Sequence, residues 1–222
     1  MADLHYLFED RSDAGKKLAK RLLPRQTGKE AMVLALSPGG VLVGSEIASA
    51  FNLPLELFIL NKLHVPGQPE RTFGAVTESG KIFLNSDIVT RYEIPDNYIQ
   101  QAILSQKREI QHHQRLLSKE RKRPNFQRKE MIVVDDGVQT GATLFAALQT
   151  LRARRAEKVT LAIPVAPEDL VEKIKNGSDE AVILHAIPFF SSLENYYLRF
   201  DPVSHDEVVS TLRKINEGKK AA

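Results

Sequence analysis

An apolar run that ends in two adjacent carboxylates constrains the fold of this chain more than any other feature. Residues 132 to 144 read IVVDDGVQTGATL, in which Asp135 and Asp136 follow the apolar residues and a helical pattern begins at Leu144. A short, continuously apolar strand followed directly by a helix is typical of a parallel sheet that is buried on both faces. The segment therefore predicts an α/β fold with polar groups at the carboxyl end of a strand.

The turn between this strand and this helix has the composition of an anion-binding site. Gly137 and Gly141 allow backbone angles and close approach that a Cβ would block. Thr140 and Thr143 supply hydroxyl donors, and the start of the following helix adds unpaired backbone N–H groups. Carboxylates do not hold a phosphate, so the two aspartates need ribose hydroxyls or a nearby Mg²⁺ as partners. Helix capping alone explains only one or two of these residues.

Strand-like and helix-like patterns alternate along the rest of the chain. Strands are expected at residues 31–36, 53–60, 130–134, 158–163 and 181–185, and helices at 12–23, 41–51, 96–117, 143–154, 167–176 and 206–215. Residues 61–72 carry two prolines and a glycine and are expected to form a loop, followed by a hairpin at 73–85. Alternation of this kind predicts a mostly parallel sheet with helices on its faces. Because ligands bind beyond the carboxyl ends of such strands, loops 37–41, 61–73 and 135–143 are expected to converge.

The composition limits the other chemistry that is open to this chain. It has no cysteine, so disulfides, thiol catalysis and thiolate metal sites are excluded. Residues 1–17 lack the apolar core of a signal peptide, and no apolar run approaches the roughly 20 residues of a membrane span. We therefore expect a cytoplasmic protein without a membrane partner.

One segment is strongly basic although the net charge of the chain is only +3. Residues 107–130 contain nine Lys or Arg residues and three Glu residues. Such a segment could bind nucleic acid. The only aromatic residue within it is Phe126, however, and a solvated helix face with its exit loop is the favoured interpretation. Nucleic acid is therefore not an expected partner.

The segment at 132–144 resembles the phosphoribosyl-diphosphate (PRPP) motif of type I phosphoribosyltransferases, which has four apolar residues, two acids and a Thr-Gly-x-Thr turn. The runs FEDRSDAGKKLAKRL at 8–22, SPGGV at 37–41, NKLHVPGQPERTFGAV at 61–76 and VTLAIPVAP at 159–167 resemble a group of predicted phosphoribosyltransferases with an unassigned acceptor. This resemblance implies a single domain over residues 1–222 with a Rossmann-like sheet. It also implies a flexible loop and hairpin at 61–85 and a small hood at 186–203.

The resemblance assigns roles to particular residues of this sequence. The residues expected to bind PRPP are Asp135, Asp136, Gly137, Val138, Gln139, Thr140, Gly141, Ala142 and Thr143. Those expected to bind pyrophosphate are Ser37, Gly39, Gly40 and Lys62. The catalytic residues would be Asp135, Asp136, Lys62 and Arg71, where Arg71 and His64 lie in a segment that resembles a closing catalytic loop. Mg²⁺ is the expected cofactor, held by PRPP near the two aspartates and without a direct protein ligand.

Three positions depart from the pattern of the family. Ser37 stands where close relatives are expected to have a cation, and Asn61 replaces the first residue of a cationic pair. Gln139 stands where purine-salvage enzymes have an aspartate that contacts the purine, and an amide cannot accept a proton as a carboxylate does. These departures argue against hypoxanthine or guanine salvage. A structural Pro-Gly-Gly turn at 37–41 and a solvated Lys62 remain alternatives to anion binding.

The hood segment is rich in aromatic residues. Phe189, Phe190, Tyr196 and Tyr197 could stack on a planar acceptor, and the alternative is a small core under a long loop. Near the N-terminus, an Asp-Arg pair recurs in the resembling group, which places Arg11 either near the site or on the surface beside a helix cap.

The sequence therefore predicts an enzyme that transfers the 5-phosphoribosyl group from PRPP to a nitrogenous base or amine and releases pyrophosphate. Its partners would be PRPP and a small-molecule acceptor, and a homodimer is left open. Two other functions remain open. One is a PRPP sensor that binds nucleic acid through the basic segment, and the other is a hydrolase or phosphorylase of phosphoribosyl compounds.

Overall fold

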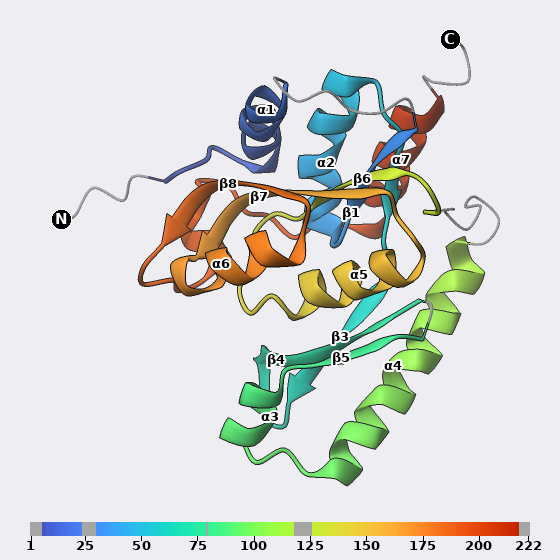
Figure 1. The fold of residues 1–222 in the computed structure, drawn as a ribbon, viewed down its shortest axis with the longest axis vertical. Helices are drawn as coiled ribbons and strands as arrows, with labels where there is room; N and C mark the ends of the chain where they lie inside the picture. Colours follow the sequence, from blue (N-terminus) through green and yellow to red (C-terminus); the bar gives the residue numbers. More distant parts are fainter. Residues whose placement is uncertain (1–5, 24–29, 79, 118–125, 218–222) are drawn as a thin grey trace. The chain divides into compact units, whose positions relative to one another are not determined.

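The computed structural model describes residues 6–23, 30–78, 80–117 and 126–217 (Figure 1). The chain divides into two compact units. The first unit comprises Met1–Leu57, Phe126–Gln139 and Arg155–Ala222, and the second comprises Phe58–Asn125 and Thr140–Arg154. Each unit is described separately below, and the expected single domain over residues 1–222 stays a prediction.

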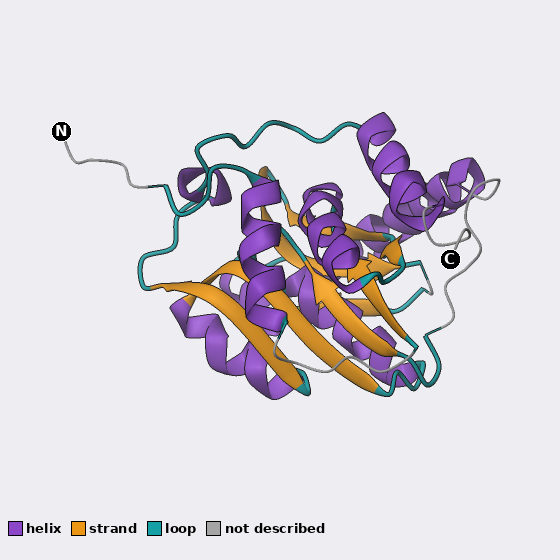
Figure 2. Ribbon diagram, turned by 90° about the horizontal axis from the view of Figure 1, so that it is seen from above, coloured by secondary structure: helices purple, strands orange, loops and turns teal. Residues whose placement is uncertain are grey.

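The first unit contains a five-stranded sheet in which every neighbouring pair is parallel (Figure 2). The order across the sheet is β2 (Leu55–Leu57), β1 (Ala31–Ala35), β6 (Glu130–Val134), β7 (Lys158–Pro167) and β8 (Glu180–Ile187). From β1 the chain moves to β2 on one side, whereas β6, β7 and β8 extend to the other side. The strand order therefore reverses between β1 and β6, and the predicted α/β fold with a parallel sheet is confirmed.

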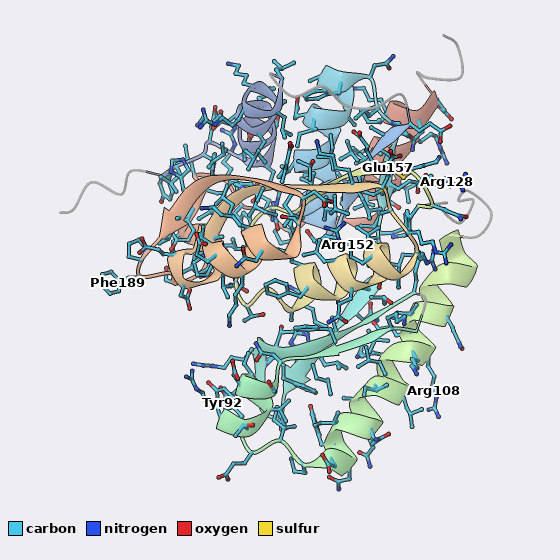
Figure 3. All side chains as sticks on the ribbon, in the orientation of Figure 1. Tyr92, Arg108, Arg128, Arg152, Glu157 and Phe189 are labelled. Carbon is cyan, nitrogen blue, oxygen red and sulfur yellow. The ribbon has the colours of Figure 1, made fainter. Side chains whose placement is uncertain are left out.

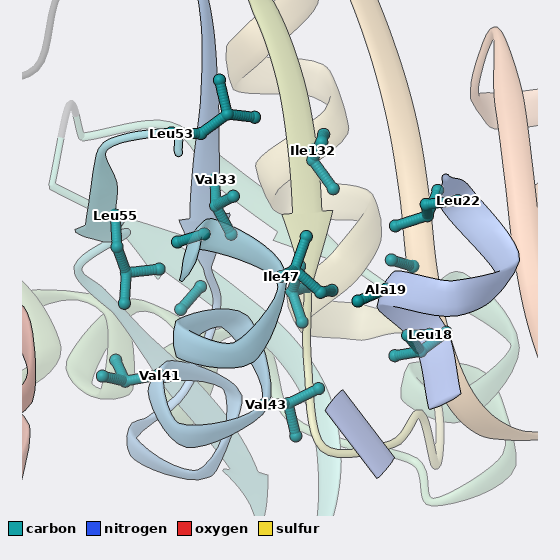
Figure 4. Packing of buried hydrophobic residues seen from close by; sticks show 14 of the residues in the cluster. Leu18, Ala19, Leu22, Val33, Val41, Val43, Ile47, Leu53, Leu55 and Ile132 are labelled. Carbon is teal, nitrogen blue, oxygen red and sulfur yellow. The ribbon is translucent and has the colours of Figure 1, made fainter. Parts of the chain in front are cut away.

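Helices cover both faces of this sheet. They are α1 (Arg11–Leu22), α2 (Pro38–Phe51), α6 (Glu168–Gly177) and α7 (His205–Glu217). The helices α1, α2 and α7 lie on one face and α6 lies on the other, as the opposite directions of the β1-to-β2 and β7-to-β8 connections require (Figure 1). Leu18, Ile47 and Ile132 meet in the core between α1, α2 and the strands (Figure 4). All five residues of β1 are buried, as expected for a central parallel strand.

The second unit contains a three-stranded antiparallel sheet with three helices. The strands are β3 (Leu60–Val65), β4 (Gln68–Thr77) and β5 (Ile82–Leu84), in the order β3-β4-β5. The helices are α3 (Ser86–Arg91), α4 (Asp96–Leu117) and α5 (Ala142–Ala153). Its core is formed around Leu63, Phe73 and Ile99. The helix α5 packs against all three strands of this sheet.

The expected loop at 61–72 is wrong, because these residues form β3 and the first half of β4. Gly67, with φ +72, makes the tight turn between the two strands. Pro69 does not break the hairpin, because the register of β3 and β4 shifts between the pairs Val65–Gln68 and His64–Thr72. A proline is tolerated where the ladder is interrupted in this way. The hairpin expected at 73–85 is confirmed by the pairing of β4 with β5.

Several element boundaries differ from those predicted. The strand expected at 53–60 is shortened to β2, and β7 continues four residues past its expected end to Pro167. The short helix α3 was not predicted; Asn85 caps it by accepting hydrogen bonds from the N–H groups of Asp87 and Ile88. No helix in the described part of the chain is both long enough and apolar enough to cross a membrane.

Candidate functional site

The two aspartates lie where the strand order reverses. Asp135 and Asp136 follow β6 directly and are buried, with 7% and 8% of their surfaces exposed. The neighbouring strand β1 ends in register with β6, since Ala35 pairs with Val134. The N–H of Leu36 then donates to the Val134 carbonyl at 2.9 Å, so the segments that leave β1 and β6 stay together for one more residue. The turn that begins at residue 37 is thereby brought against the acidic pair.

Ser37 links the start of α2 to Asp135. Its hydroxyl donates to Asp135 Oδ1 and accepts from the N–H of Gly40 at 2.9 Å. Asp135 Oδ1 also accepts from the N–H of Asp136 at 3.0 Å. The helix α2 begins at Pro38, so the expected loop at 37–41 is in fact an N-cap followed by the first helical turn. The expected start of this helix at Val41 was therefore too late.

Gly39 allows α2 to approach the acidic pair closely. A Cβ at this position would overlap Asp136 Oδ2 and would lie 2.6 Å from Asp136 Cγ. It would also lie 2.7 Å from Arg11 Nε. Gly40 is less crowded, since its Cβ would lie 3.2 Å from the Cα of Asp135. Gly39 is therefore needed for packing against the aspartates, and Gly40 makes a tight but milder contact with them.

Arg11 belongs to the site and not to the surface. Only 9% of it is exposed, and its Nε donates to Asp136 Oδ2 at 2.8 Å. Its Nη1 donates to the carbonyl of Asp201 at 2.8 Å, and its guanidinium lies 3.8 Å from the centre of the Phe200 ring. The preceding residue, Asp10, caps α1 by accepting from the N–H of Asp13. The sequence left Arg11 either near the site or on the surface beside a helix cap; the structure has the Asp10 cap, but Arg11 is buried against Asp136.

Tyr197 is a buried hydrogen-bond donor and does not face an acceptor site. It is 2% exposed, and its ring packs between Phe8 and Phe200 at centroid distances of 5.1 and 5.0 Å. Its hydroxyl donates to the backbone carbonyl of Asp136 at 2.6 Å. Burial, reinforced by the negative charge of Asp136, raises the pKa of Tyr197 far above its ordinary value, so the phenol stays protonated. The expected stacking of Tyr197 on an acceptor is therefore wrong, and the alternative of a small core holds for this residue.

One other residue of the hood segment lies beside the acidic turn. Leu193 packs against Gly137, where an added Cβ would overlap its side chain. Phe190 and Tyr196 form a ring pair at a centroid distance of 5.2 Å, and Phe189 is 95% exposed and projects from the ribbon (Figure 3). The roles of these three aromatic residues toward an acceptor stay predictions.

The second half of the PRPP-like segment forms the start of α5. Val138 is fixed by its N–H, which donates to the Val165 carbonyl at 2.9 Å, whereas Gln139 is exposed. Gly141 has φ +74, a left-handed conformation that favours glycine, and it is the N-cap residue of α5. Because its N-cap residue is a glycine, α5 has no hydrogen bond from an N-cap side chain. The Thr140 hydroxyl accepts only a long contact, 3.5 Å, from the N–H of Ala142, and Thr143 is 9% exposed.

The expected cations of the second unit lie on the β3–β4 hairpin. Lys62 is exposed on β3, opposite Ala75. Arg71 is exposed on β4; it donates to the hydroxyl of Tyr92, and its guanidinium lies 5.4 Å from the centre of that ring (Figure 3). His64 is also exposed on β3, and its carbonyl accepts from the hydroxyl of Tyr98 at 3.1 Å. Their roles in catalysis stay predictions.

The basic segment at 107–130 falls only partly on described residues. Lys107 and Arg108 lie on α4, and Arg128 and Lys129 precede β6 (Figure 3). Residues 118–125, which carry four of the nine basic side chains, lie outside the described residues. The interpretation of this segment as a solvated surface therefore stays a prediction.

Comparison with known proteins identifies the family. The family model described as the phosphoribosyl transferase domain matches residues 9–182. Two Mycobacterium tuberculosis proteins, from strains CDC 1551 and H37Rv, are 39% identical to this chain over 206 residues and carry provisional phosphoribosyl transferase names. The match covers 93% of this chain but 46% of each relative, so the chain spans about half the length of the curated relatives it matches.

A solved structure shares the fold of this chain. The crystal structure of the protein TT1426 from Thermus thermophilus is 31% identical to this chain and superposes with a TM-score of 0.76. The likeness covers 93% of this chain and 98% of that protein. The family model covers well over half of the 222 residues, including the acidic pair, the start of α2 and the start of α5. This chain belongs to the phosphoribosyl transferase domain family.

Proposed function

We propose that this protein transfers the 5-phosphoribosyl group of PRPP to a nitrogenous base or amine. The bond between ribose C1 and the pyrophosphate oxygen breaks, and its electron pair leaves with pyrophosphate. The lone pair of the acceptor nitrogen forms the new bond to C1, and that nitrogen loses its proton to solvent. One observation carries the proposal: a buried acidic pair at the strand reversal is followed in the chain by a helix whose N-cap residue is a glycine and offers no capping side chain.

The acidic pair is suited to bind the ribose ring. Asp135 and Asp136 are held in fixed orientations by Ser37 and Arg11. Carboxylate oxygens accept hydrogen bonds, and the vicinal hydroxyls of ribose donate them. Fixed acceptors of this kind place C1 for attack and favour the positive charge that develops on the sugar as the pyrophosphate leaves.

The start of α5 is suited to bind the 5-phosphate. The residues that would surround the phosphate are Gly137, Val138, Gln139, Thr140, Gly141, Ala142 and Thr143. A helix start whose N-cap residue has no side chain presents backbone N–H groups and the positive end of the helix dipole to an anion. Gly141, in its left-handed conformation, lets the chain enter the helix without a Cβ at the turn.

The leaving pyrophosphate would be bound by backbone and cationic groups. Ser37, Gly39, Gly40 and Lys62 are the residues proposed for this role, and Gly39 and Gly40 lie in the first turn of α2. Lys62 lies on β3, and Arg71, which is proposed as a catalytic residue, lies on β4. Ser37 has a different role from the cation expected at its position, because its hydroxyl caps α2 and donates to Asp135. Positive charge for pyrophosphate must therefore come from other groups.

Mg²⁺ fits this site as an ion that arrives with PRPP. The described residues hold no group of three or more His, Cys, Asp or Glu side chains close enough to bind a metal by themselves. Mg²⁺ commonly binds through one or two carboxylates together with substrate phosphates. PRPP would hold the ion near Asp135 and Asp136, without a direct protein ligand, and the ion would neutralise charge on the pyrophosphate.

The acceptor is proposed to differ from the purines of salvage enzymes. Gln139 is exposed and offers an amide where a carboxylate would bind the purine ring. The half-buried pair of Phe190 and Tyr196, with exposed Phe189, is the aromatic surface of the hood. We propose that an aromatic or amine acceptor binds beside it. A cytoplasmic location and a homodimer stay predictions.

Thermal unfolding with PRPP tests the donor. Millimolar PRPP with Mg²⁺ should raise the melting temperature of the wild-type protein by mass action. Asp136→Asn should reduce this increase. Asp169→Asn removes the same charge from an exposed position in the first turn of α6 and should leave it unchanged. An absence of any increase with wild-type protein would contradict the proposal.

Pyrophosphate release tests the reaction. The protein is incubated with PRPP, Mg²⁺ and a panel of purine, pyrimidine and amine acceptors, and the pyrophosphate released is measured. Release that depends on one class of acceptor supports transfer to that class. Release at the same rate without any acceptor indicates that water is the acceptor, which is the hydrolase alternative.

A further inference from the structure

Arg11 makes three simultaneous contacts inside the first unit. Its Nε donates to Asp136 Oδ2, its Nη1 donates to the Asp201 carbonyl, and its guanidinium plane lies over the Phe200 ring. The side chain is nine-tenths buried, and such a buried cation is costly unless it is paired. The partner of Arg11 is Asp136, one of the two carboxylates that we propose to bind ribose. The buried arginine therefore contacts the proposed ribose site itself.

The contact divides the two oxygens of Asp136 between different tasks. Oδ2 is occupied by Arg11, and Gly39 packs against the same oxygen. Oδ1 has one long contact among the described residues, 3.5 Å from the Ser37 hydroxyl. A carboxylate that is held through one oxygen has its plane fixed, and the other oxygen is then aimed in one direction.

We propose that Arg11 is a positioning residue that fixes the Asp136 carboxylate so that Oδ1 accepts a hydrogen bond from a ribose hydroxyl. This proposal rests on the proposed function of the site. Arg11 acts through Asp136 and does not itself touch the substrate. Its positive charge also offsets the repulsion between two buried carboxylates that are adjacent in the chain.

The C-terminal segment holds Asp136 from two sides. The Tyr197 hydroxyl donates to the backbone carbonyl of Asp136 at 2.6 Å. The Asp201 carbonyl and the Phe200 ring hold Arg11, which in turn holds the carboxylate. The segment 197–201 therefore fixes both the backbone and the side chain of one residue of the acidic pair.

An arginine suits this position better than a lysine. Its planar guanidinium can donate in two directions while its face stacks on an aromatic ring. A lysine ammonium in the same place keeps the charge, but it cannot donate in that fixed geometry and lie flat on Phe200. Arg11→Lys therefore separates the effect of charge from the effect of geometry.

The chain offers a matched control for these variants. Arg199 lies in the same C-terminal segment, and its Nη2 pairs with Glu9 and Asp10 at 2.9 and 2.7 Å. It thus joins the same two parts of the chain as Arg11 does, but at the exposed surface and without contact to Asp136. Arg199→Gln removes one positive charge and one link between these parts.

The experiment compares Arg11→Gln, Arg11→Lys and Arg199→Gln for binding of PRPP with Mg²⁺ by titration calorimetry. Arg11→Gln should weaken PRPP binding about tenfold, the effect of losing one charge-assisted hydrogen bond. Arg11→Lys should also weaken it, and Arg199→Gln should stay within about twofold. In an Asp136→Asn background, Arg11→Gln should change binding by no more than about twofold, because both act on one interaction.

Inorganic phosphate provides a readout that distinguishes positioning from general damage. Phosphate should bind at the start of α5 without using Asp136, so its affinity should be unchanged in Arg11→Gln. A variant with a disrupted fold loses binding of both PRPP and phosphate, and urea unfolding would also reveal the disruption. If Arg11→Gln is disrupted in this way, the PRPP and phosphate affinities of Arg11→Lys are compared with those of the wild-type protein.

The outcomes separate this inference from the proposed function. If the wild-type protein binds PRPP and both Arg11 variants bind it equally well, the inference is overturned while the proposed function stands. An effect of Arg11→Gln that is undiminished in the Asp136→Asn background also overturns it. If the wild-type protein does not bind PRPP, the proposed function falls and the inference falls with it.

Discussion

The starts of α2 and α5 look alike in sequence, and the structure builds them differently. Each follows a polar turn that contains glycine, and each was expected to bind an anion. At α2, Ser37 caps the helix and the two following glycines pack directly against the aspartates. At α5, Gly141 has a left-handed backbone and offers no capping side chain, and the Thr140 hydroxyl accepts only a long hydrogen bond, 3.5 Å, from Ala142.

This difference shows that glycines in similar turns can meet different needs. Gly39 is required because neighbouring atoms occupy the space of a Cβ, whereas Gly141 is required mainly because of its backbone angle. The start of α2 therefore supports the acidic pair through an internal contact, in addition to its proposed role toward pyrophosphate. The start of α5 keeps its helix donors for a ligand. Four substitutions test this distinction.

Gly39→Ala should have the largest effect on stability. Its Cβ would overlap Asp136 Oδ2 and press on Arg11, so the buried ion pair must separate or α2 must move. We expect a loss of about 3 kcal/mol or more in the free energy of unfolding, measured with urea. Gly44→Ala is the control in the same helix, because its Cβ would come no closer than 3.0 Å to a neighbouring atom, the end of the Leu55 side chain. Equal losses in the two variants would contradict the assignment.

Ser37→Ala should have the next largest effect. The variant loses the N-cap of α2 and the hydroxyl donor to Asp135, which together are worth about 2 kcal/mol. The free energy of unfolding from urea denaturation measures the loss. Ser45→Ala removes a hydroxyl that donates only to the Leu42 carbonyl within the same helix, and it should cost much less. A similar cost for both would show that the link to Asp135 contributes little.

Gly141→Ala should cost about 1.5 kcal/mol, the usual penalty for a left-handed alanine. Its Cβ would also lie 2.5 Å from the ring of Phe145, which must shift. Gly80→Ala is the control, since Gly80 has φ +83 and no atom within 4 Å of the added Cβ. Gly141→Ala alone should reduce the increase in melting temperature with PRPP. Equal reductions in both variants would remove α5 as the phosphate site.

Tyr197→Phe should have the smallest effect, a loss of about 1 kcal/mol in the free energy of unfolding, because it removes the hydrogen bond to the Asp136 carbonyl. Asp136 is the aspartate against which the start of α2 packs. The raised pKa of Tyr197 adds a dependence on pH. Its contribution is complete below pH 10.0, the ordinary value, and is lost as pH rises above it, because the unfolded chain releases the proton first. Urea unfolding between pH 8 and 11 should show this alkaline loss in the wild type and less of it in Tyr197→Phe. Identical alkaline profiles would contradict the buried donor.

Much of the fold was readable from local patterns. The continuous apolar run at Ala31–Ala35 predicted a buried parallel strand, and the spacing of Leu18 and Leu22 predicted a helix. The loop expected at 61–72 was wrong because prolines were read as breaking a strand. The register shift beside Pro69 could not be seen without its partner strand.

Sequence analysis predicted only part of the candidate site, because contacts between residues far apart in the chain cannot be seen in local patterns. The acidic pair and the turn after it were visible because they are contiguous in sequence. Arg11 could be placed only by a contact that spans 125 residues of chain, and the burial of Tyr197 against Phe8 spans even more. A recurring Asp-Arg pair was the only sequence signal for Arg11, and it fits a helix cap equally well.

The sequence by itself determined the alternation of strands and helices, the position of the two aspartates after β6 and the likeness to phosphoribosyltransferases. These depend on periodicity and on residues that are neighbours in the chain. Only the tertiary structure decided which side chains hold those aspartates. Ser37, Gly39, Arg11 and Tyr197 reach them from three separate segments, and only folding brings those segments to one end of the sheet.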